Sequence, residues 1–157
     1  MVDDHYQIKQ RTSQFFAAQM MTQEWAQPVD AEHKQFLVTS NVKDSEGHAL
    51  VTAYALNRPD GQWSLMLINK DYDNPYSVRV LFHDSENNRV NAFAGPVTMI
   101  TFGKAQYQWH PNRKRGYADP EGPPVATSVT ATEDTWYKLP PASLTIVRGR
   151  LQAEVGH

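Results

Sequence analysis

The sequence predicts a mainly β protein, an antiparallel β-sandwich with one N-terminal α-helix. A helical spacing of apolar residues is confined to the first 28 positions and ends at Pro28. From residue 35 onward, short apolar runs alternate with polar turn clusters, and no helical spacing lies between them. Arg58-Pro59-Asp60-Gly61-Gln62 contains a Pro-Asp-Gly core that is typical of a tight turn between antiparallel strands. Many short strands joined by polar turns favour a sandwich of antiparallel sheets.

The helix is expected over residues 4–27, with Asp3 or Asp4 capping its first turn. Pro28 cannot continue it. Apolar side chains at spacings of three, four and seven form a broad stripe, made of Ile8, Phe15, Phe16, Ala17, Met20, Met21 and Trp25. A helix stripe with this many aromatic residues must pack against another part of the protein or against another domain. The packing partner is either the rest of this domain or a neighbouring domain outside this chain.

The strands are expected at 35–39, 50–57, 63–69, 77–83, 96–102, 105–110, 125–131, 136–139 and 143–150. Trp63 alternates with two leucines and is expected to close one end of the core. Residues 110–124 contain four prolines and two glycines, which predicts a long loop without a regular element. The chain is thus divided into an N-terminal helix, 1–28, and a β-sandwich domain, 29–157.

Composition excludes several classes of function. The 157 residues carry 15 basic and 17 acidic side chains, so there is no basic excess for a nucleic-acid partner. Cysteine is absent, which removes disulfides and thiol chemistry. The acidic N-terminus is not a signal peptide, and the apolar runs are far shorter than the roughly 20 residues of a membrane span. We therefore expect neither nucleic acid nor membrane as a partner.

No motif for catalysis, a metal or a cofactor is present. The six histidines are scattered without paired spacing. The run Asp71-Tyr72-Asp73-Asn74 lacks the glycine and the distal glutamate of a calcium loop, so a solvated turn is expected. There is no Gly-x-Ser-x-Gly and no glycine-rich phosphate loop. The acidic residues fall mainly in the turns and the helix, so no catalytic residue is assigned.

Aromatic and polar residues gather near residues 107–121. Tyr107 and Trp109 are two apart in a strand pattern, which predicts that they share a face. Aromatic rings stack on the C–H faces of sugars while polar side chains bind the hydroxyls. The candidate carbohydrate-binding residues are Tyr107, Trp109, His110, Arg113, Tyr117, Asp119 and Trp136. Contact with a partner domain and simple core packing remain alternative interpretations of these aromatics.

Several segments resemble one known domain. Leu139-Pro140-Pro141-Ala142-Ser143-Leu144-Thr145-Ile146-Val147-Arg148 resembles the closing strand of the β-sandwich that follows the catalytic barrel in many clan-A glycoside hydrolases. Val51-Thr52-Ala53-Tyr54-Ala55 and the run from Trp63 to Asn69-Lys70 resemble its central strands. Residues 17–25 are similar to the last helix of the barrel. The families concerned are β-xylosidases, arabinofuranosidases and related xylanases.

The resemblance implies a non-catalytic accessory or carbohydrate-binding domain of an enzyme acting on plant-type polysaccharide such as xylan, in an extracellular or periplasmic location. The barrel, about 250 residues long, is absent, so no catalytic residue is carried over. The implied partners are a polysaccharide or oligosaccharide, and a catalytic barrel or a second copy bound through the helix. The alternatives are a protein-interaction or oligomerisation domain that binds no sugar, and a small stand-alone glycosidase.

Overall fold

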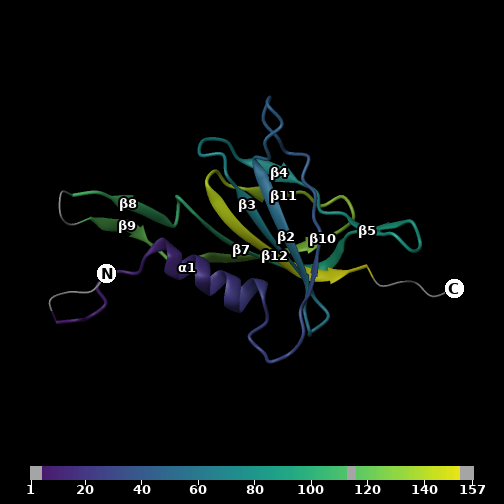
Figure 1. The fold of residues 1–157 in the computed structure, drawn as a ribbon, viewed down its shortest axis with the longest axis horizontal. Helices are drawn as coiled ribbons and strands as arrows, with labels where there is room; N and C mark the ends of the chain where they lie inside the picture. The colour runs from purple at the N-terminus through teal and green to yellow at the C-terminus, as the bar shows by residue number, and fades with distance from the viewer. Residues whose placement is uncertain (1–4, 113–115, 153–157) are drawn as a thin grey trace.

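The computed structural model describes residues 5–112 and 116–152, and its centre is a six-stranded antiparallel sheet (Figure 1). The strand order is β1-β2-β3-β12-β7-β10. The bounds are Lys34–Phe36 for β1, Val51–Asn57 for β2, Trp63–Asn69 for β3, Phe93–Gly103 for β7, Val125–Ala131 for β10 and Ser143–Leu151 for β12. The mainly β, antiparallel fold with a single N-terminal helix is confirmed.

Three two-stranded sheets complete the described part of the chain. They pair β4 (Tyr76–Val78) with β11 (Tyr137–Leu139), β5 (Phe82–Asp84) with β6 (Arg89–Asn91), and β8 (Tyr107–His110) with β9 (Tyr117–Glu121). The β8–β9 hairpin projects from one side of the molecule beside the start of the helix, while β5 lies at the opposite end (Figure 1). No helix in the described residues has the length and apolarity needed to cross a bilayer.

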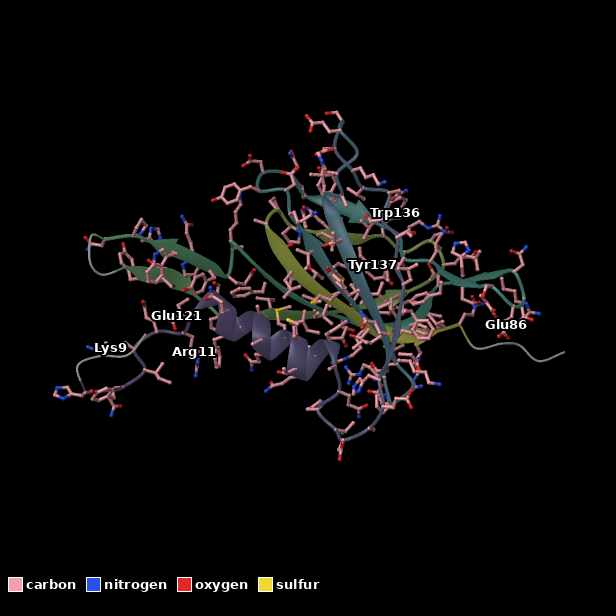
Figure 2. All side chains as sticks on the ribbon, viewed as in Figure 1. Lys9, Arg11, Glu86, Glu121, Trp136 and Tyr137 are labelled. Atoms are coloured by element: carbon pink, nitrogen blue, oxygen red, sulfur yellow. The ribbon has the colours of Figure 1, made fainter. Side chains whose placement is uncertain are left out.

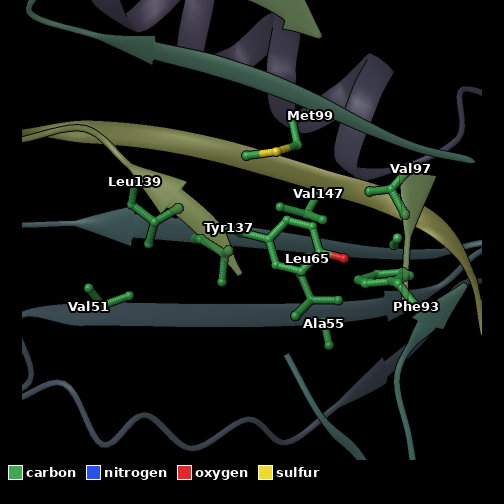
Figure 3. Packing of buried hydrophobic residues seen from close by; sticks show 11 residues of the cluster. Val51, Ala55, Leu65, Phe93, Val97, Met99, Tyr137, Leu139 and Val147 are labelled. Atoms are coloured by element: carbon green, nitrogen blue, oxygen red, sulfur yellow. The ribbon is translucent and has the colours of Figure 1, made fainter. Parts of the chain in front are cut away.

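Both faces of the six-stranded sheet are apolar, which explains the unbroken run Leu65-Met66-Leu67-Ile68. Leu65 and Leu67 face a core closed by the second layer, where Tyr137 lies near Phe93 and Val147 (Figure 3). Burial raises the pKa of Tyr137 to about 12. Met66 faces the other core, under the helix. The second layer of the sandwich is built from the short sheets β4–β11 and β5–β6 rather than from one continuous sheet.

The helix is shorter than the sequence predicted. It begins at Ser13, continues as α1 (Ser13–Gln19) and ends in one π-helical segment, η1 (Met20–Trp25). Thr12 is the N-cap, and its hydroxyl accepts a hydrogen bond from the Phe15 amide. The expected start at residue 4 and the expected aspartate cap are therefore wrong. Of the predicted stripe, Phe16 and Met20 are buried, whereas Ile8, Phe15 and Met21 are exposed.

Contacts with β9 explain why the helix starts late. The side-chain amide of Gln10 donates to the carbonyl of Ala118 and accepts from the amide of the same residue, at 3.2 Å in each case. The amide of Arg11 donates to the Glu121 carboxylate. Residues 10 and 11 are thus attached to the hairpin, and the backbone amide of Arg11 is already bonded to a side chain. Tertiary contacts here override helix propensity.

Two arginines attach the end of the helix to the sheet. The carbonyl of Glu24 accepts from Arg58 at 2.7 Å and from Arg148 at 3.2 Å, and Arg148 also pairs with the Glu24 carboxylate at 2.8 Å. Arg58 is buried and makes an ion pair with Asp60 at 3.1 Å. Two cations at a helix C-terminus satisfy its free carbonyl and interact favourably with the helix dipole.

Replacing Arg58 by methionine should lower the free energy of unfolding by about 2–4 kcal/mol, because it removes the shorter of the two arginine hydrogen bonds to the Glu24 carbonyl and the ion-pair partner of Asp60. Chemical denaturation measures the loss, and hydrogen exchange should show that the helix amides lose the most protection. Lys138→Met, at an exposed position of β11, is the matched control. Equal unfolding free energies and unchanged helix protection for Arg58→Met would contradict this assignment.

Two strand predictions are corrected. The predicted loop over 110–124 contains β9, which pairs with β8. The register shifts between Tyr107 and Trp109, so Pro120 lies where the ladder is irregular and its missing N–H is tolerated. The predicted strand 77–83 is split into β4 and β5, which belong to different sheets. The turn at 58–62 is confirmed, with the Arg58 amide bonded to the Gln62 carbonyl at 2.9 Å and Gly61 at a φ of 75°.

Candidate functional site

A cavity of about 500 Å³ lies between the β8 strand, the start of α1 and the ends of β3, β7 and β12. We call it the hairpin cavity. Its lining comprises Ser13, Ala17, Ile68, Asn69, Tyr72, Phe102, Gly103, Lys104, Tyr107, Gln108, Trp109, Ala142, Ser143 and Leu144. Apolar side chains of the sheet and helix are combined there with two exposed aromatic rings and with an ammonium, an amide and hydroxyl groups. Such a mixture can stack a ring and bind hydroxyls at the same time.

Trp109 borders the hairpin cavity and is 45% exposed. Gly116, across the hairpin, packs directly on its indole, because a Cβ at this position would overlap the six-membered ring. The lack of a side chain at Gly116 thus lets the hairpin support one part of the indole while much of it remains exposed to solvent. A half-exposed ring held in place is suited to stacking, since little side-chain entropy remains to be lost on binding.

Tyr107 borders the same cavity but is more deeply packed than Trp109. Its ring lies 5.9 Å from that of Phe102 and 6.3 Å from that of Phe16, between centroids. Its hydroxyl donates to the Arg11 carbonyl at 3.4 Å. Tyr107 therefore belongs to the helix-side core and connects that core to the hairpin. It contributes to the wall of the cavity, while Trp109 provides the accessible ring.

Tyr72 is the second exposed aromatic residue at the cavity, with 68% of its surface accessible. Lys104 lies over its ring at 4.8 Å from the centroid and donates to its carbonyl at 3.1 Å. The loop that carries Tyr72 is held by Asp71. Its carboxylate accepts from the amides of Asp73 and Asn74 at 2.9 and 3.0 Å, and from the Tyr76 hydroxyl at 2.8 Å.

These hydrogen bonds predict a pH dependence. They hold the pKa of the Asp71 carboxyl well below its ordinary value of 3.8, chiefly through the amides of Asp73 and Asn74. Because the folded-state pKa is depressed, the stabilisation is fully present above the ordinary value and is lost as the pH falls below it. Asp71→Asn should reduce the difference in melting temperature between pH 7 and pH 3. If the difference in melting temperature between pH 7 and pH 3 were the same in the variant and the wild type, the Asp71 carboxylate would not contribute to the loss of stability at low pH.

Asn69 joins the loop of Tyr72 to the start of β12. Its side chain is almost fully buried, and its amide nitrogen donates to the carbonyls of Asn74 at 2.9 Å and Pro140 at 2.8 Å. Its amide oxygen accepts from the Asp71 amide at 3.0 Å. The Asn69-Lys70 and Leu139-Pro140 segments, which separately carry a family resemblance, are therefore bonded to each other through this one side chain.

The other predicted site residues are divided among different places. His110 and Tyr117 stack on each other at 5.1 Å between ring centroids, and the His110 Nε2 donates to the Asp119 carbonyl at 2.9 Å. These three residues belong to the hairpin but do not line the cavity. Arg113 lies outside the described residues. Trp136 is 62% exposed and lies beside Tyr137, away from the hairpin (Figure 2). Of the six candidate residues that the structure describes, only Tyr107 and Trp109 line the cavity.

Sequence reasoning missed Tyr72, Lys104 and Gln108. Tyr72 stood in a run that the sequence predicts to be a solvated turn, and Lys104 follows a glycine at the end of β7. Neither residue belongs to a periodic pattern in the sequence. Their position at the cavity depends instead on which strand ends lie next to each other in the sheet. To predict them, one would have to know that β12 pairs with both β3 and β7.

A larger cavity of about 650 Å³ lies between β2, β3 and the segments 36–42 and 78–86. Its inner wall is mainly aliphatic, with Val51, Ala53, Leu65 and Leu67. The ring of Trp63, as predicted, closes one end of the core, packed 4.7 Å from Phe36 and 5.0 Å from Phe82. Trp63 is thus covered by two rings, while Phe36 is the exposed aromatic residue of this cavity.

The carboxyl groups whose pKa is shifted do not resemble a glycosidase acid. Asp44, Asp71 and Asp84 all have lowered pKa values, because they accept hydrogen bonds in turns: Asp44 mainly from His48, Asp71 from Asp73 and Asp84 from Asn87. A general acid for glycoside cleavage needs the opposite shift. Within residues 5–112 and 116–152, no group of three or more histidine or carboxylate side chains is arranged so that it could hold a metal ion.

No protein-family model and no curated protein matches this sequence. Parts of solved glycoside hydrolases do match the structure. A GH51 α-L-arabinofuranosidase from Thermotoga petrophila RKU-1 matches with a TM-score of 0.42 and 13% identity, over 65% of this chain and 19% of that one. Cel44A, a GH family 44 endoglucanase from Clostridium thermocellum, matches with a TM-score of 0.42 and 17% identity, over 66% and 17%. An α-L-arabinofuranosidase from Thermotoga maritima matches with a TM-score of 0.42 and 12% identity, over 66% and 20%. This chain thus spans only 17–20% of the length of those proteins.

Proposed function

We propose that the chain is a non-catalytic, carbohydrate-binding β domain that accompanies a glycoside hydrolase acting on plant-type polysaccharide. One observation carries the binding part of this proposal. Trp109 and Tyr72, two exposed aromatic residues from distant parts of the sequence, border one cavity together with Lys104 and Gln108. Rings that stack on a sugar and polar groups that bind its hydroxyls are thus combined in the lining of one cavity.

The accessory part of the proposal rests on the sequence resemblance described above. Its motifs occupy adjacent positions in the fold, since Asn69 of β3 bonds to the Leu139-Pro140 segment before β12. Phe15 and Met21 on the helix are 47% and 41% exposed. Exposed apolar side chains on a helix are expected where a catalytic domain packs against an accessory one.

Affinity electrophoresis tests the binding proposal. The protein is run in native gels that contain soluble xylan, glucan or mannan, and its mobility is compared with that in a gel without polysaccharide. We expect retardation in at least one of these gels and no release of reducing ends from any polysaccharide. Cleavage would instead support a stand-alone glycosidase. Unchanged mobility in every gel would contradict the sugar-binding proposal and favour an interaction domain.

The interaction domain is a second candidate because of the same two helix residues, Phe15 and Met21. In that case their replacement by glutamate would abolish association with a catalytic barrel or with a second copy, and Trp109 would have no role in binding. A Trp109→Ala variant therefore distinguishes the two candidates, since we expect it to weaken sugar retention in the first case and to change nothing in the second.

A further inference from the structure

The six-stranded sheet ends at β10, and the outer edge of this strand is free. Among the described strands, β10 pairs only with β7, from Val125 opposite Thr101 to Ala131 opposite Gly95. Its outer edge therefore presents backbone N–H and C=O groups over seven residues. Such an edge is a template for pairing with another strand, and proteins that avoid such pairing protect it.

The two edges of the sheet differ in protection. The opposite edge strand, β1, has only three residues and begins with Lys34, directly after Glu32 and His33. In contrast, β10 reads VATSVTA and lies in an uncharged run from residue 122 to residue 132. Short length and charge make β1 a poor template, whereas β-branched residues without charge make β10 a good one.

Neither covering layer extends over most of β10. Val125, Ala126, Thr127 and Ser128 are all exposed, although they alternate between the two faces of the sheet. Only Val129 and Ala131 pack against the core on the side of the second layer. On the other side, the helix packs against Phe102 of β7. The core under the helix includes no residue of β10. The edge of the sheet is therefore uncovered on both faces over residues 125–128, where a seventh strand could be added.

We propose that β10 pairs antiparallel with β10 of a second copy of this chain, about a two-fold axis at Ser128. This register places Val125 opposite Ala131, Ala126 opposite Thr130, and Thr127 opposite Val129. Small and β-branched side chains oppose one another, and no like charges meet. The pairing joins two six-stranded sheets into one continuous sheet. It covers the free β10 edge of each copy in a closed, symmetric contact. A second copy is favoured over a foreign strand because the sequence of β10 complements itself.

Charge substitutions at the axis test this proposal. Ser128 is exposed, so both Ser128→Lys and Ser128→Glu should fold normally. Each variant alone brings two like charges face to face and should raise the dimer dissociation constant about tenfold or more. An equimolar mixture of the two brings opposite charges together and should restore the dimer. Sedimentation velocity over a range of concentrations measures the association, and circular dichroism checks the fold.

Gln35→Lys on β1 is the matched control, because it adds the same charge to the other edge of the same sheet. It should leave the dimer unchanged. A wild-type protein that stays monomeric at every concentration would overturn the proposal. So would a Ser128→Lys variant that dimerises like the wild type. If Phe15→Glu alone abolished the dimer, the second copy would be bound through the helix instead.

Discussion

Asn69→Leu should be the most destabilising single change among the residues around the hairpin cavity. The expected loss is about 3–4 kcal/mol of unfolding free energy, which corresponds to roughly a 10 °C fall in melting temperature. Leucine has a similar volume, but it can neither donate to the carbonyls of Asn74 and Pro140 nor accept from the Asp71 amide. These backbone groups would then be left without partners in a largely buried place, where each costs about 1–3 kcal/mol.

Thermal and chemical denaturation measure this loss. Asn112→Leu, at an exposed position of the hairpin, is the matched control and should change the melting temperature little. Because Asn69 holds the loop that carries Tyr72, the variant should also weaken any polysaccharide retention. A melting temperature equal to that of the wild type would show that water satisfies these groups, and that Asn69 does not organise the site.

Local sequence signals predicted the strands well where the pattern and the turn agreed. The runs at 51–57 and 63–69 flank Pro59-Asp60-Gly61, and both strands and their connection are as expected. The closing strand was also predicted, since Leu144, Ile146 and Val147 surround a single buried threonine and include residues buried on both faces. In each case the information lies within a few residues of the chain.

Contacts between distant residues explain the errors. The helix starts at Ser13 because Gln10 and Arg11 bond to β9, about 110 residues away in the sequence. The Pro-rich segment forms β9 because its irregular register accommodates Pro120. The carbohydrate-binding role of the candidate residues stays a prediction. Tyr107 and Trp109 do border a common cavity, but Tyr72 joins them only because the end of β3 meets the ends of β7 and β12.

Trp109→Ala should reduce polysaccharide retention more than any other single change at the hairpin cavity. Loss of one stacking platform is worth about 1–3 kcal/mol, by analogy with the stacking of bases on aromatic side chains. This corresponds to about a five- to 150-fold weaker affinity. Trp109 is 45% exposed and its support is Gly116, so its removal should leave the melting temperature nearly unchanged.

Trp136 provides the matched control. It is the same residue type, it is 62% exposed, and it lies outside the cavity beside β11 (Figure 2). If any exposed tryptophan bound polysaccharide without specificity, both alanine variants would lose retention to a similar extent. The proposed site requires the loss at Trp109 alone.

The most direct measurement is therefore the retention of wild type, Trp109→Ala and Trp136→Ala in one affinity gel, on the polysaccharide that retards the wild type most. We expect that Trp109→Ala migrates almost as in the polysaccharide-free gel, whereas Trp136→Ala is retarded like the wild type. Normal retardation of a stably folded Trp109→Ala variant would contradict a carbohydrate site at the hairpin cavity.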